Sequence, residues 1–424
     1  MQERLLHFIW RFQYFNKKDL TASQGQSVNV LHPGFPNMDA GPDFLNARIE
    51  IDGILWVGDV EIHIKSSGWT HHRHHEDARY DSVALHVSWE HDAEARRNDG
   101  SVIPGIELKH KVVPGLLHRY NDLVNSPLKT PCAGRLNDVD RVVVLSMTER
   151  ALAERLENKT DWIRKNLEEK KGDWEEIAYR ALARNMGFKT NAGAFLQLAA
   201  AVPYRIIARH LHRGHQVEAL LFGQAGFLDH SAGDPYFMEL KKEYEFLAAK
   251  YQLQRAKMSR FQWKFMRMRP ANFPTIRIAQ FAALLIRNRN LFALFRDHCQ
   301  DALRRALTAV QSMYWQEHYD FGKKAKRPNR GVTVDGATNI MINTAAPLLT
   351  AFGKASGEQR FVDKALGILA ALPPENNHVV RMWKDMGIEA KNAFDSQGLL
   401  ELYNNYCCKK KCIDCSIGVR LLQN

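Results

Sequence analysis

Residues 40–69 read AGPDFLNARIEIDGILWVGDVEIHIKSSGW, and this stretch decides the fold of the first part of the chain. Its runs NARIEI and LWVGDVEIHIK have the composition and alternation of strands, and the Asp-Gly pair between them predicts a tight hairpin turn. Because side chains alternate along a strand, we expect Glu61, His63 and Lys65 to share one face of a half-buried sheet, with apolar residues filling the other.

The segments around this hairpin complete a mixed α/β domain, which we assign to residues 1–135. An amphipathic helix is followed by three strands, a short helix and a fourth strand, with one more strand beyond. These segments are MQERLLHFIWRFQYF, SVNVL, NARIEI, LWVGDVEIHIK, HHRHHEDARYD, SVALHVSW and GIELKHKVV. Residues 136–400 show helical periodicity almost throughout, and residues 401–424 are rich in cysteine. The predicted fold class is α+β: a mixed α/β domain, a large all-helical region and a C-terminal cysteine cluster.

Charge is unevenly distributed along the 424 residues. Residues 1–110 contain 11 Lys and Arg against 16 Asp and Glu, a net charge of −5, whereas the remaining 314 residues carry 48 against 31, or +17. This pattern fits a polyanion bound by the second part and a cation held by the first; the alternative is that it only keeps the protein soluble. No apolar run approaches the ~20 residues of a membrane span, and no signal peptide is recognisable. We therefore expect a cytoplasmic protein without a membrane partner.

The charged side chains around the hairpin fit phosphodiester hydrolysis. Asp43 lies just before the first strand of the hairpin and can sit across from Glu61, His63 and Lys65. Two carboxylates can hold a divalent ion that neutralises a scissile phosphate, while a neighbouring lysine orients the attacking water. The alternative is that Asp43 caps a turn and that Glu61 and Lys65 form a solvated pair on a half-exposed strand.

These residues resemble the PD-(D/E)XK, or restriction-endonuclease-like, nuclease superfamily. Pro42-Asp43 matches the first half of its motif, Lys65 matches its lysine, and the order helix, three strands, helix, strand resembles its core. The resemblance implies a metal-dependent nuclease acting on DNA or RNA, with Mg²⁺ or Mn²⁺. His63 stands where the superfamily usually has an acid. Either Glu61 and His63 bind the metal, with a preference shifted towards Mn²⁺ or Zn²⁺, or the fold survives as a non-catalytic binder of nucleic acid or of a partner.

Phrases from nearly the whole chain also resemble a bacterial family of domains of unknown function. They are ERLLHFIW, GPDFLNARI, VEIHIKSSGW, YDSVALHV, RPANFPTIRIAQFA, NTAAPLL and the C-terminal cysteines. This resemblance implies kinship but neither an activity nor a protein partner. The sequence has no Gly-x4-Gly-Lys phosphate loop and no Gly-x-Ser-x-Gly elbow, two patterns that would indicate other chemistry.

A histidine-rich segment, WTHHRHHEDARYD, offers a third possibility. Helical spacing places several of its side chains around one turn: His71, His74 and His75, with Asp77 or Arg79. Gathered with Glu61, these histidines would make a metal hydrolase that is not a nuclease; a solvated polar turn is the plain alternative. We expect His86, inside VALHVSW, to be a core histidine with a satisfied hydrogen bond.

The cysteines form a second candidate ligand set. Four of them crowd the tail, Cys407, Cys408, Cys412 and Cys415, and Cys132 is a candidate to complete the set. Such thiols can supply a tetrahedral Zn²⁺ site or most of the ligands of an iron–sulfur cluster. The alternative is a disordered tail with reactive cysteines.

Two basic segments are candidate nucleic-acid contacts. Residues 257–277 mix cations with aromatic rings, and among the cations are Lys264 and Arg267. Three apolar residues of this segment fall at helical spacing and are expected to face the core: Phe261, Phe265 and Met268. A second group lies in a loop that we expect to be flexible: Lys323, Lys324, Lys326, Arg327 and Arg330. A further boundary signal is Gly187, which we expect to be the left-handed glycine that ends a helix.

Overall fold

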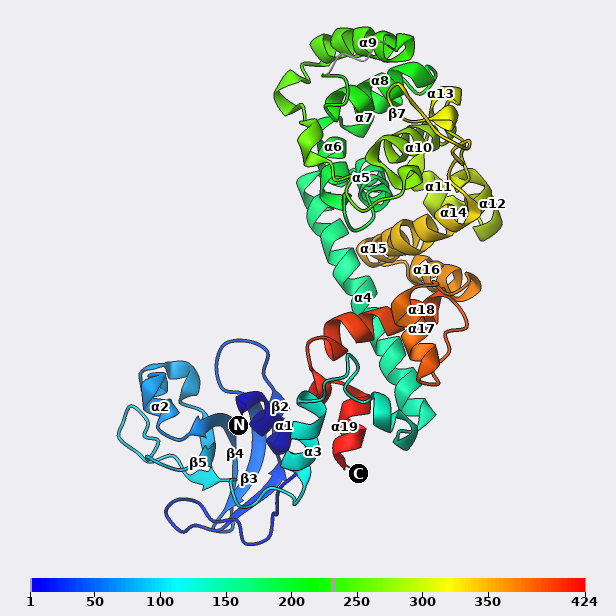
Figure 1. Ribbon diagram of the computed structural model, residues 1–424. Helices are drawn as coiled ribbons and strands as arrows, with labels where there is room; N and C mark the ends of the chain where they lie inside the picture. Colours follow the sequence, from blue (N-terminus) through cyan, green and yellow to red (C-terminus); the bar gives the residue numbers. More distant parts are fainter. Residues whose placement is uncertain (1, 230–233, 424) are drawn as a thin grey trace. The chain divides into compact units, whose positions relative to one another are not determined.

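The computed structural model describes residues 2–229 and 234–423. The chain divides into two compact units: unit 1 comprises Met1–Met147 and Tyr403–Asn424, and unit 2 comprises Thr148–Leu402. Unit 1 contains the sheet, and unit 2 is almost entirely helical (Figure 1). The predicted α+β class is therefore confirmed at this level. The cysteine-rich tail packs with unit 1, although the sequence analysis treated it as a separate segment.

A mixed sheet forms the centre of unit 1. Its elements are α1 (Glu3–Arg11), β1 (Val28–His32), β2 (Phe35–Pro36), β3 (Phe44–Ile51), β4 (Ile54–Lys65), β5 (Val83–Glu90) and β6 (Gly105–Glu107). The strand order is β1-β3-β4-β5-β6, with β2 added to β3. The pairs β1–β3 and β3–β4 are antiparallel, whereas β4–β5 and β5–β6 are parallel. The last strand is shorter than the run GIELKHKVV predicts.

The β3–β4 hairpin forms where its sequence predicts it. Asp52 and Gly53 have φ values of 49° and 78°, and positive φ at both central residues is the signature of a turn that matches strand twist. Beyond the turn, β4 changes character. The half from Ile54 to Val57 is exposed, whereas the half from Val60 to His63 is buried on both faces. The prediction of a half-buried strand is therefore wrong at Glu61 and His63, since neighbouring segments cover their face too.

Helical segments fill out the rest of unit 1. They are α2 (Gly68–His71), η1 (His74–Glu76), η2 (Ala78–Tyr80), α3 (Leu116–Val124), η3 (Ala133–Asp138), η9 (Cys412–Asp414) and α19 (Ser416–Gln423). The first three connect the parallel strands β4 and β5. The C-terminal helix α19 packs on α3, where Arg119 Nε donates a 3.0 Å hydrogen bond to the carbonyl oxygen of Leu422 (Figure 1). The two ends of the chain thus fold as one body.

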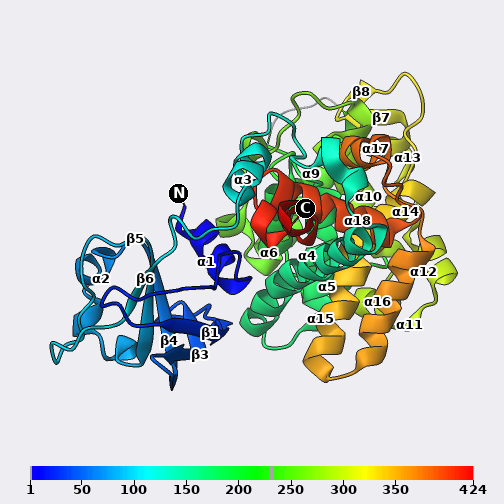
Figure 2. The same cartoon turned by 90° about the horizontal axis from the view of Figure 1, so that it is seen from below.

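Unit 2 is a helical body around one large apolar core (Figure 2). Its helices are α4 (Arg141–Glu169), which begins in unit 1, α5 (Trp174–Met186), α6 (Ala192–Ala201), α7 (Tyr204–Ala208), α8 (Gly214–Gln224), α9 (Pro235–Tyr251), α10 (Pro274–Arg287), α11 (Leu291–Asp297), α12 (Gln300–Leu307), α13 (Met313–Glu317), α14 (Val334–Ile340), α15 (Ala346–Ser356), α16 (Gln359–Ala371), α17 (His378–Asp385) and α18 (Ala393–Glu401). A π-helical turn η7 (Met341–Ala345) joins α14 to α15, and a second, η8 (Leu402–Cys407), follows α18. Across the two described ranges, no helix combines the length and apolar character needed to cross a bilayer.

The end of α5 differs from the prediction. Gly187 has φ −77°, and the following residue, Phe188, takes the left-handed conformation with φ 49°. Gly187 is needed for a different reason: a Cβ there would lie 2.4 Å from the carbonyl oxygen of Asn191. An aromatic residue therefore carries the left-handed strain, which costs roughly 1–2 kcal/mol outside glycine.

The segment 257–273 is irregular rather than helical. It contains the short 3-10 turns η5 (Arg260–Gln262) and η6 (Pro270–Asn272), and a third such turn, η4 (Gln254–Ala256), precedes it. Phe261 is 91% exposed, so its predicted core position is wrong, and Trp263 is the buried ring instead. The reason is a pair of 2.9 Å hydrogen bonds that join the Asn191 side-chain amide to the backbone N–H and carbonyl of Lys264. This pairing holds the backbone in a non-helical path.

Candidate metal centre

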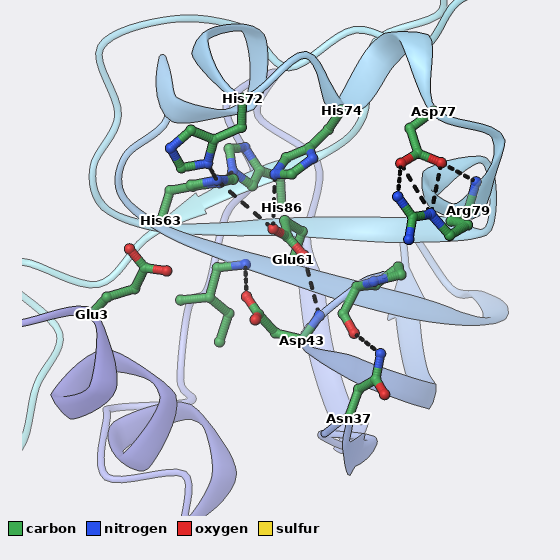
Figure 3. Close-up of polar contacts among 12 residues, drawn as sticks. Glu3, Asn37, Asp43, Glu61, His63, His72, His74, Asp77, Arg79 and His86 are labelled. Carbon is green, nitrogen blue, oxygen red and sulfur yellow. Dashed lines mark hydrogen bonds and ion pairs between the residues drawn. The ribbon is translucent and has the colours of Figure 1, made fainter. Parts of the chain in front are cut away.

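The carboxyl groups of Asp43 and Glu61 are fixed by a reciprocal pair of backbone hydrogen bonds. The Asp43 N–H donates to Glu61 Oε2 at 3.1 Å, and the Ile62 N–H donates to Asp43 Oδ2 at 3.0 Å (Figure 3). Asn37 holds the preceding turn, because its Nδ2 donates to the Pro42 carbonyl at 2.9 Å. The two acids predicted from the sequence therefore meet at the edge between β3 and β4.

Three imidazoles lie on the other side of Glu61. Its Oε1 is 3.2 Å from His74 Nε2 and 3.7 Å from His63 Nε2. His63 Nε2 is also 3.1 Å from His72 Nδ1, and His63 Nδ1 is 2.9 Å from His86 Nε2. Figure 3 shows the rings of His63, His72 and His74 gathered above the Glu61 carboxyl. The strand β4 supplies the centre of this group, and the β4–β5 connection supplies its rim.

Burial sets the protonation of this group. Glu61 is only 5% exposed, and burial, then the charge of Asp43, raises its pKa to about 9. His63 is 3% exposed, and burial followed by the neighbouring imidazoles, His86 first, lowers its pKa to about 3. Burial also lowers the pKa of His86 to about 4 and that of His74 below its usual range. Near neutral pH, Glu61 thus keeps its proton and these three histidines are neutral, so their ring nitrogens are competent metal ligands.

Aromatic side chains hold the imidazoles in place. Tyr80 stacks on His74 with ring centroids 3.9 Å apart, and the buried Trp69 packs on both His74 and His86. Gly68 allows α2 to approach the His63 ring, since a Cβ at Gly68 would lie 2.6 Å from His63 Cδ2. The SSGW sequence that follows β4 is therefore needed for packing as well as for the turn.

The arrangement fits a divalent transition-metal ion. His63, His72 and His74 each contribute one ring nitrogen, and these three atoms all lie within 4.8 Å of one another. Ligands around a tetrahedral ion with 2.1 Å bonds are about 3.4 Å apart, and His63 Nε2 and His72 Nδ1 are 3.1 Å apart. Glu61 Oε1 lies at similar distances from two of the imidazoles, 3.2 Å from His74 Nε2 and 3.7 Å from His63 Nε2. If His63 Nε2 binds the ion, its Nδ1–H donates to His86 Nε2, an outer-shell bond of the kind that orients metal-binding histidines.

Several predicted residues lie outside this group. The Lys65 side chain is 60% exposed, and its Nζ is 4.0 Å from Asp92 Oδ2. Asp77 caps η2 and holds Arg79, and His71 is exposed. His75 forms its ion pair with Glu76. His74 does reach Glu61, whose burial excludes the alternative of a solvated Glu61–Lys65 pair.

Two histidines that contact His63 were not predicted to belong to the site: His72 and His86. Helical spacing groups His71, His74 and His75 and leaves His72 out, whereas α2 ends at His71 and Arg73 takes φ 58°. That break turns His72 and His74 towards the same point. His86 is buried as expected, but its Nδ1 has no hydrogen-bond partner among the described residues. The parallel register between β4 and β5, which pairs Glu61 with His86, was the signal that sequence alone could not supply.

The cysteines converge within unit 1. The buried thiols are Cys132, Cys407, Cys412 and Cys415, whereas Cys408 is exposed. Burial raises the pKa of Cys132 to about 12 and that of Cys412 to about 11, and nearby thiols add to both shifts. Gly418 permits the packing of α19, because a Cβ there would lie 2.1 Å from the Cys412 carbonyl oxygen. Within the described chain, no three of these thiols meet the 4.8 Å limit that the histidines meet.

The cations predicted to contact nucleic acid are all exposed: Lys264, Arg267, Lys323, Lys324, Lys326, Arg327 and Arg330. The expected flexible loop is partly tied down. Its first two lysines form β8 (Lys323–Lys324), which pairs with β7 (His318–Asp320). Asn329 Nδ2 donates to the carbonyls of Trp315 and His318 at 3.0 and 2.8 Å.

Fold and site together define an α+β protein with a histidine–carboxylate centre on its N-terminal sheet. The chain belongs to the family described as protein of unknown function (DUF2851), whose profile matches residues 3–378. This match includes the candidate metal centre and ends before the C-terminal cysteines. Neither the curated proteins nor the solved structures contain a match to this chain.

Proposed function

We propose that unit 1 is a metal-dependent hydrolase that cleaves phosphodiester bonds in DNA or RNA. The observation that carries the proposal is the group of three imidazoles beside the buried Glu61 carboxyl. Apart from the two-residue strand β2 and the 3-10 turns η1 and η2, the order α1, β1, β3, β4, α2, β5 agrees with the helix–three strands–helix–strand order of the nuclease superfamily that the sequence resembles. The excess of positive charge after residue 110 suits a polyanionic substrate.

The residues divide into two roles in this proposal. His63, His72 and His74 hold the ion, which suits Mn²⁺ or Zn²⁺ better than Mg²⁺ because imidazole is a nitrogen ligand. When bound, such an ion supplies positive charge to the scissile phosphate and acidifies the attacking water. A cation beside Glu61 favours its ionised form, so with the ion bound the Glu61 carboxylate would accept the proton from that water. Asp43 orients Glu61 through the hydrogen bond that its N–H donates. The sequence prediction placed Asp43, Glu61 and His63 on the ion; in this proposal only His63 keeps that role, His72 and His74 join it, and Asp43 and Glu61 serve the attacking water.

Lys65 is the observation that favours a second candidate. Its ion pair is with Asp92, and within residues 2–229 and 234–423 it makes none with Asp43 or Glu61. A superfamily lysine that does not contact the carboxylates is what an inactivated fold would show. The second candidate is therefore a non-catalytic protein that uses unit 1 to bind nucleic acid or a partner.

The test is cleavage of labelled single- and double-stranded DNA and RNA by the full chain with Mg²⁺, Mn²⁺, Zn²⁺ or EDTA. We expect metal-dependent cleavage that falls at least about 10³-fold in Glu61→Gln, since removing a general base or an essential metal-site group has effects of this order. Glu76→Gln, an exposed acid of the same segment, is the matched control. Lys65→Ala separates two forms of the hydrolase: lost cleavage assigns a role to Lys65, and unchanged cleavage assigns the chemistry to the histidine–glutamate group. Binding without cleavage under every condition would contradict the hydrolase.

A further inference from the structure

Unit 2 contains a cavity of about 450 Å³ that the proposed hydrolase does not use. Its volume falls within the ~300–1,000 Å³ of small-molecule sites. Three cations line it: Lys159 from α4, Arg184 from α5 and Lys189 from the turn after α5. The lining contains no Asp or Glu within the described ranges, so the charge of the cavity wall is positive.

Lys159 is a cation without a charged partner. Its Nζ donates a 2.9 Å hydrogen bond to Asn343 Oδ1, and no carboxylate of the described chain lies within ion-pair distance. Burial lowers the pKa of Lys159 to about 7. The charged groups around it act in both directions: Arg155 and Arg184 lower this pKa, and Glu375 and Glu401 raise it. An anion in the cavity would compensate the buried charge.

The π-helical turn η7 leaves further polar groups at the cavity. Pro347 has no N–H to donate to the Asn343 carbonyl, which breaks the α-helical pattern at this point. The Asn343 side chain bridges Lys159 and the Asn339 carbonyl. Thr344 Oγ1 is buried and has no partner among the described residues, although Thr344 lines the cavity. Single π-helical turns occur frequently at functional sites, and a buried hydroxyl without a partner requires an explanation, which a bound ligand would supply.

Aromatic rings form the remaining wall. The Arg184 guanidinium lies over the Trp162 ring at 4.7 Å from its centroid, and this contact fixes the direction of its donors. Phe188 is 45% exposed and is held in the left-handed conformation, the kind of strain that gathers at functional sites. Phe188 also lines an adjacent cavity of about 410 Å³ together with Arg267 and Arg277. Cations beside exposed aromatic rings are the composition of nucleotide-binding surfaces.

We propose that this cavity binds the phosphate of a nucleotide, either free or at the end of a single strand, with Lys159 and Arg184 on the phosphate. Asn343 and the Thr344 hydroxyl donate or accept the remaining hydrogen bonds. The Arg277 guanidinium lies over one face of the half-exposed Phe188 ring, 4.3 Å from its centroid, and the base stacks on the other face. The site is independent of the metal centre, so it stands whether or not unit 1 cleaves phosphodiesters.

The test is calorimetric binding of adenosine monophosphate to the full chain in EDTA, which excludes the metal centre from the result. Adenosine and inorganic phosphate separate the two halves of the ligand. Short single strands with and without a terminal phosphate separate the free nucleotide from the strand end. We expect binding at least about tenfold weaker in Lys159→Met and Arg184→Met, because each removes a charge-assisted hydrogen bond. Lys242→Met, an exposed lysine of α9, carries the same charge change outside the cavity and should bind normally.

A second variant guards against misfolding. Asn343→Asp keeps the size of the side chain and gives Lys159 an internal carboxylate. It should therefore weaken nucleotide binding, and a thermal unfolding curve like that of the parent should show that the variant is folded. Binding by the phosphorylated strand alone assigns the strand end, and binding of the monophosphate assigns the free nucleotide. Unchanged affinity in all three variants, or adenosine or phosphate binding as tightly as the monophosphate, overturns the proposal.

Discussion

The candidate metal centre of unit 1 and the cavity of unit 2 contain ionisable groups of opposite sign whose charge the protein does not compensate: an acid in the metal centre and cations in the cavity. In the metal centre, a buried acid lies beside a group of imidazoles, and burial holds Glu61 in its protonated form. In the cavity, cations lack an anion, and burial favours the neutral form of Lys159. The same physical cause, desolvation, therefore raises one pKa and lowers the other.

This difference shows how a site can be recognised without a ligand. A buried ionisable group whose charge is not compensated by the protein destabilises the fold in its charged form, and a ligand of opposite charge removes that cost. The sign of that uncompensated charge then indicates the class of ligand. The four predictions below test the comparison, from the largest expected effect to the smallest.

The cysteine tail should show the largest effect, and it must be separated from the histidine centre. The sequence predicts zinc at these cysteines, although the described structure brings no three of the thiols within 4.8 Å of one another. On that prediction, the purified chain holds tightly bound zinc, and Cys412→Ser loses about one equivalent and several kcal/mol of stability, because structural zinc contributes directly to folding. Metal analysis and denaturant unfolding measure both. Cys299→Ser, an exposed cysteine of unit 2, is the control and should change neither. Full metal content in Cys412→Ser would remove the cysteines from the ligand set, and an iron–sulfur cluster would appear as visible absorbance.

The histidine centre should bind metal more weakly, but specifically. His63→Ala is expected to weaken Zn²⁺ or Mn²⁺ binding at least about 100-fold, since outer-shell changes alone cost about 10–100-fold. Metal titration of a protein that also carries Cys412→Ser measures binding at the histidine centre without a contribution from the cysteines. His118→Ala is a suitable control because His118 is an exposed histidine of α3. Equal affinity in the two variants would mean that the imidazoles do not form a metal site.

Gly68→Ala should produce a moderate effect at the same centre. The added Cβ would meet the His63 ring at 2.6 Å, and such overpacking typically costs about 1–3 kcal/mol. We expect lower stability together with weaker metal binding, because the clash displaces a ligand. Gly134→Ala in η3 is the matched control, since its Cβ would meet nothing within 4 Å. A loss of stability with unchanged metal affinity would show that the position of His63 does not control the centre.

The sequence was sufficient for the features that depend on local patterns. Alternation and the Asp-Gly turn predicted the β3–β4 hairpin, and the Pro42-Asp43 segment was correctly expected to lie opposite Glu61. It failed where tertiary packing overrides spacing. The burial of both faces of β4, the break after His71 and the non-helical path around Trp263 each depend on a neighbour distant in sequence.

The net charge of each part of the chain was predictable from the sequence, but which charged side chains lie without a partner of opposite charge was not. The exposed lysines at 323 to 330 could be read directly, whereas Lys159 looked like one more surface residue of an amphipathic helix. The hydrogen-bond partner of Lys159 is the neutral side chain of Asn343, which lies 184 residues further along the chain. Sites of this kind become visible only when the fold brings such residues together.

The change in stability per pH unit is the smallest of these effects, and it tests the comparison directly. The folded-state pKa of Glu61 is raised from 4.5 to about 9, so in metal-free protein its contribution to stability is present below about pH 4.5 and is lost as the pH rises towards 9. The folded-state pKa of Lys159 is lowered from 10.5 to about 7, so the unfolded chain binds more protons between these values and stability rises with pH across that window. Each slope is at most about 1.4 kcal/mol per pH unit.

Two variants isolate these slopes. In EDTA, the stability of Glu61→Gln relative to the parent should increase between pH 4.5 and 9, whereas that of Lys159→Met should be greatest below pH 7 and decline towards 10.5. Denaturant unfolding at several pH values measures both. Zn²⁺ should flatten the Glu61 slope, and adenosine monophosphate should flatten the Lys159 slope, because each ligand stabilises the charged form of the group that it meets. Slopes of the same sign, or slopes that neither ligand alters, would mean that the two sites do not contain uncompensated groups of opposite sign.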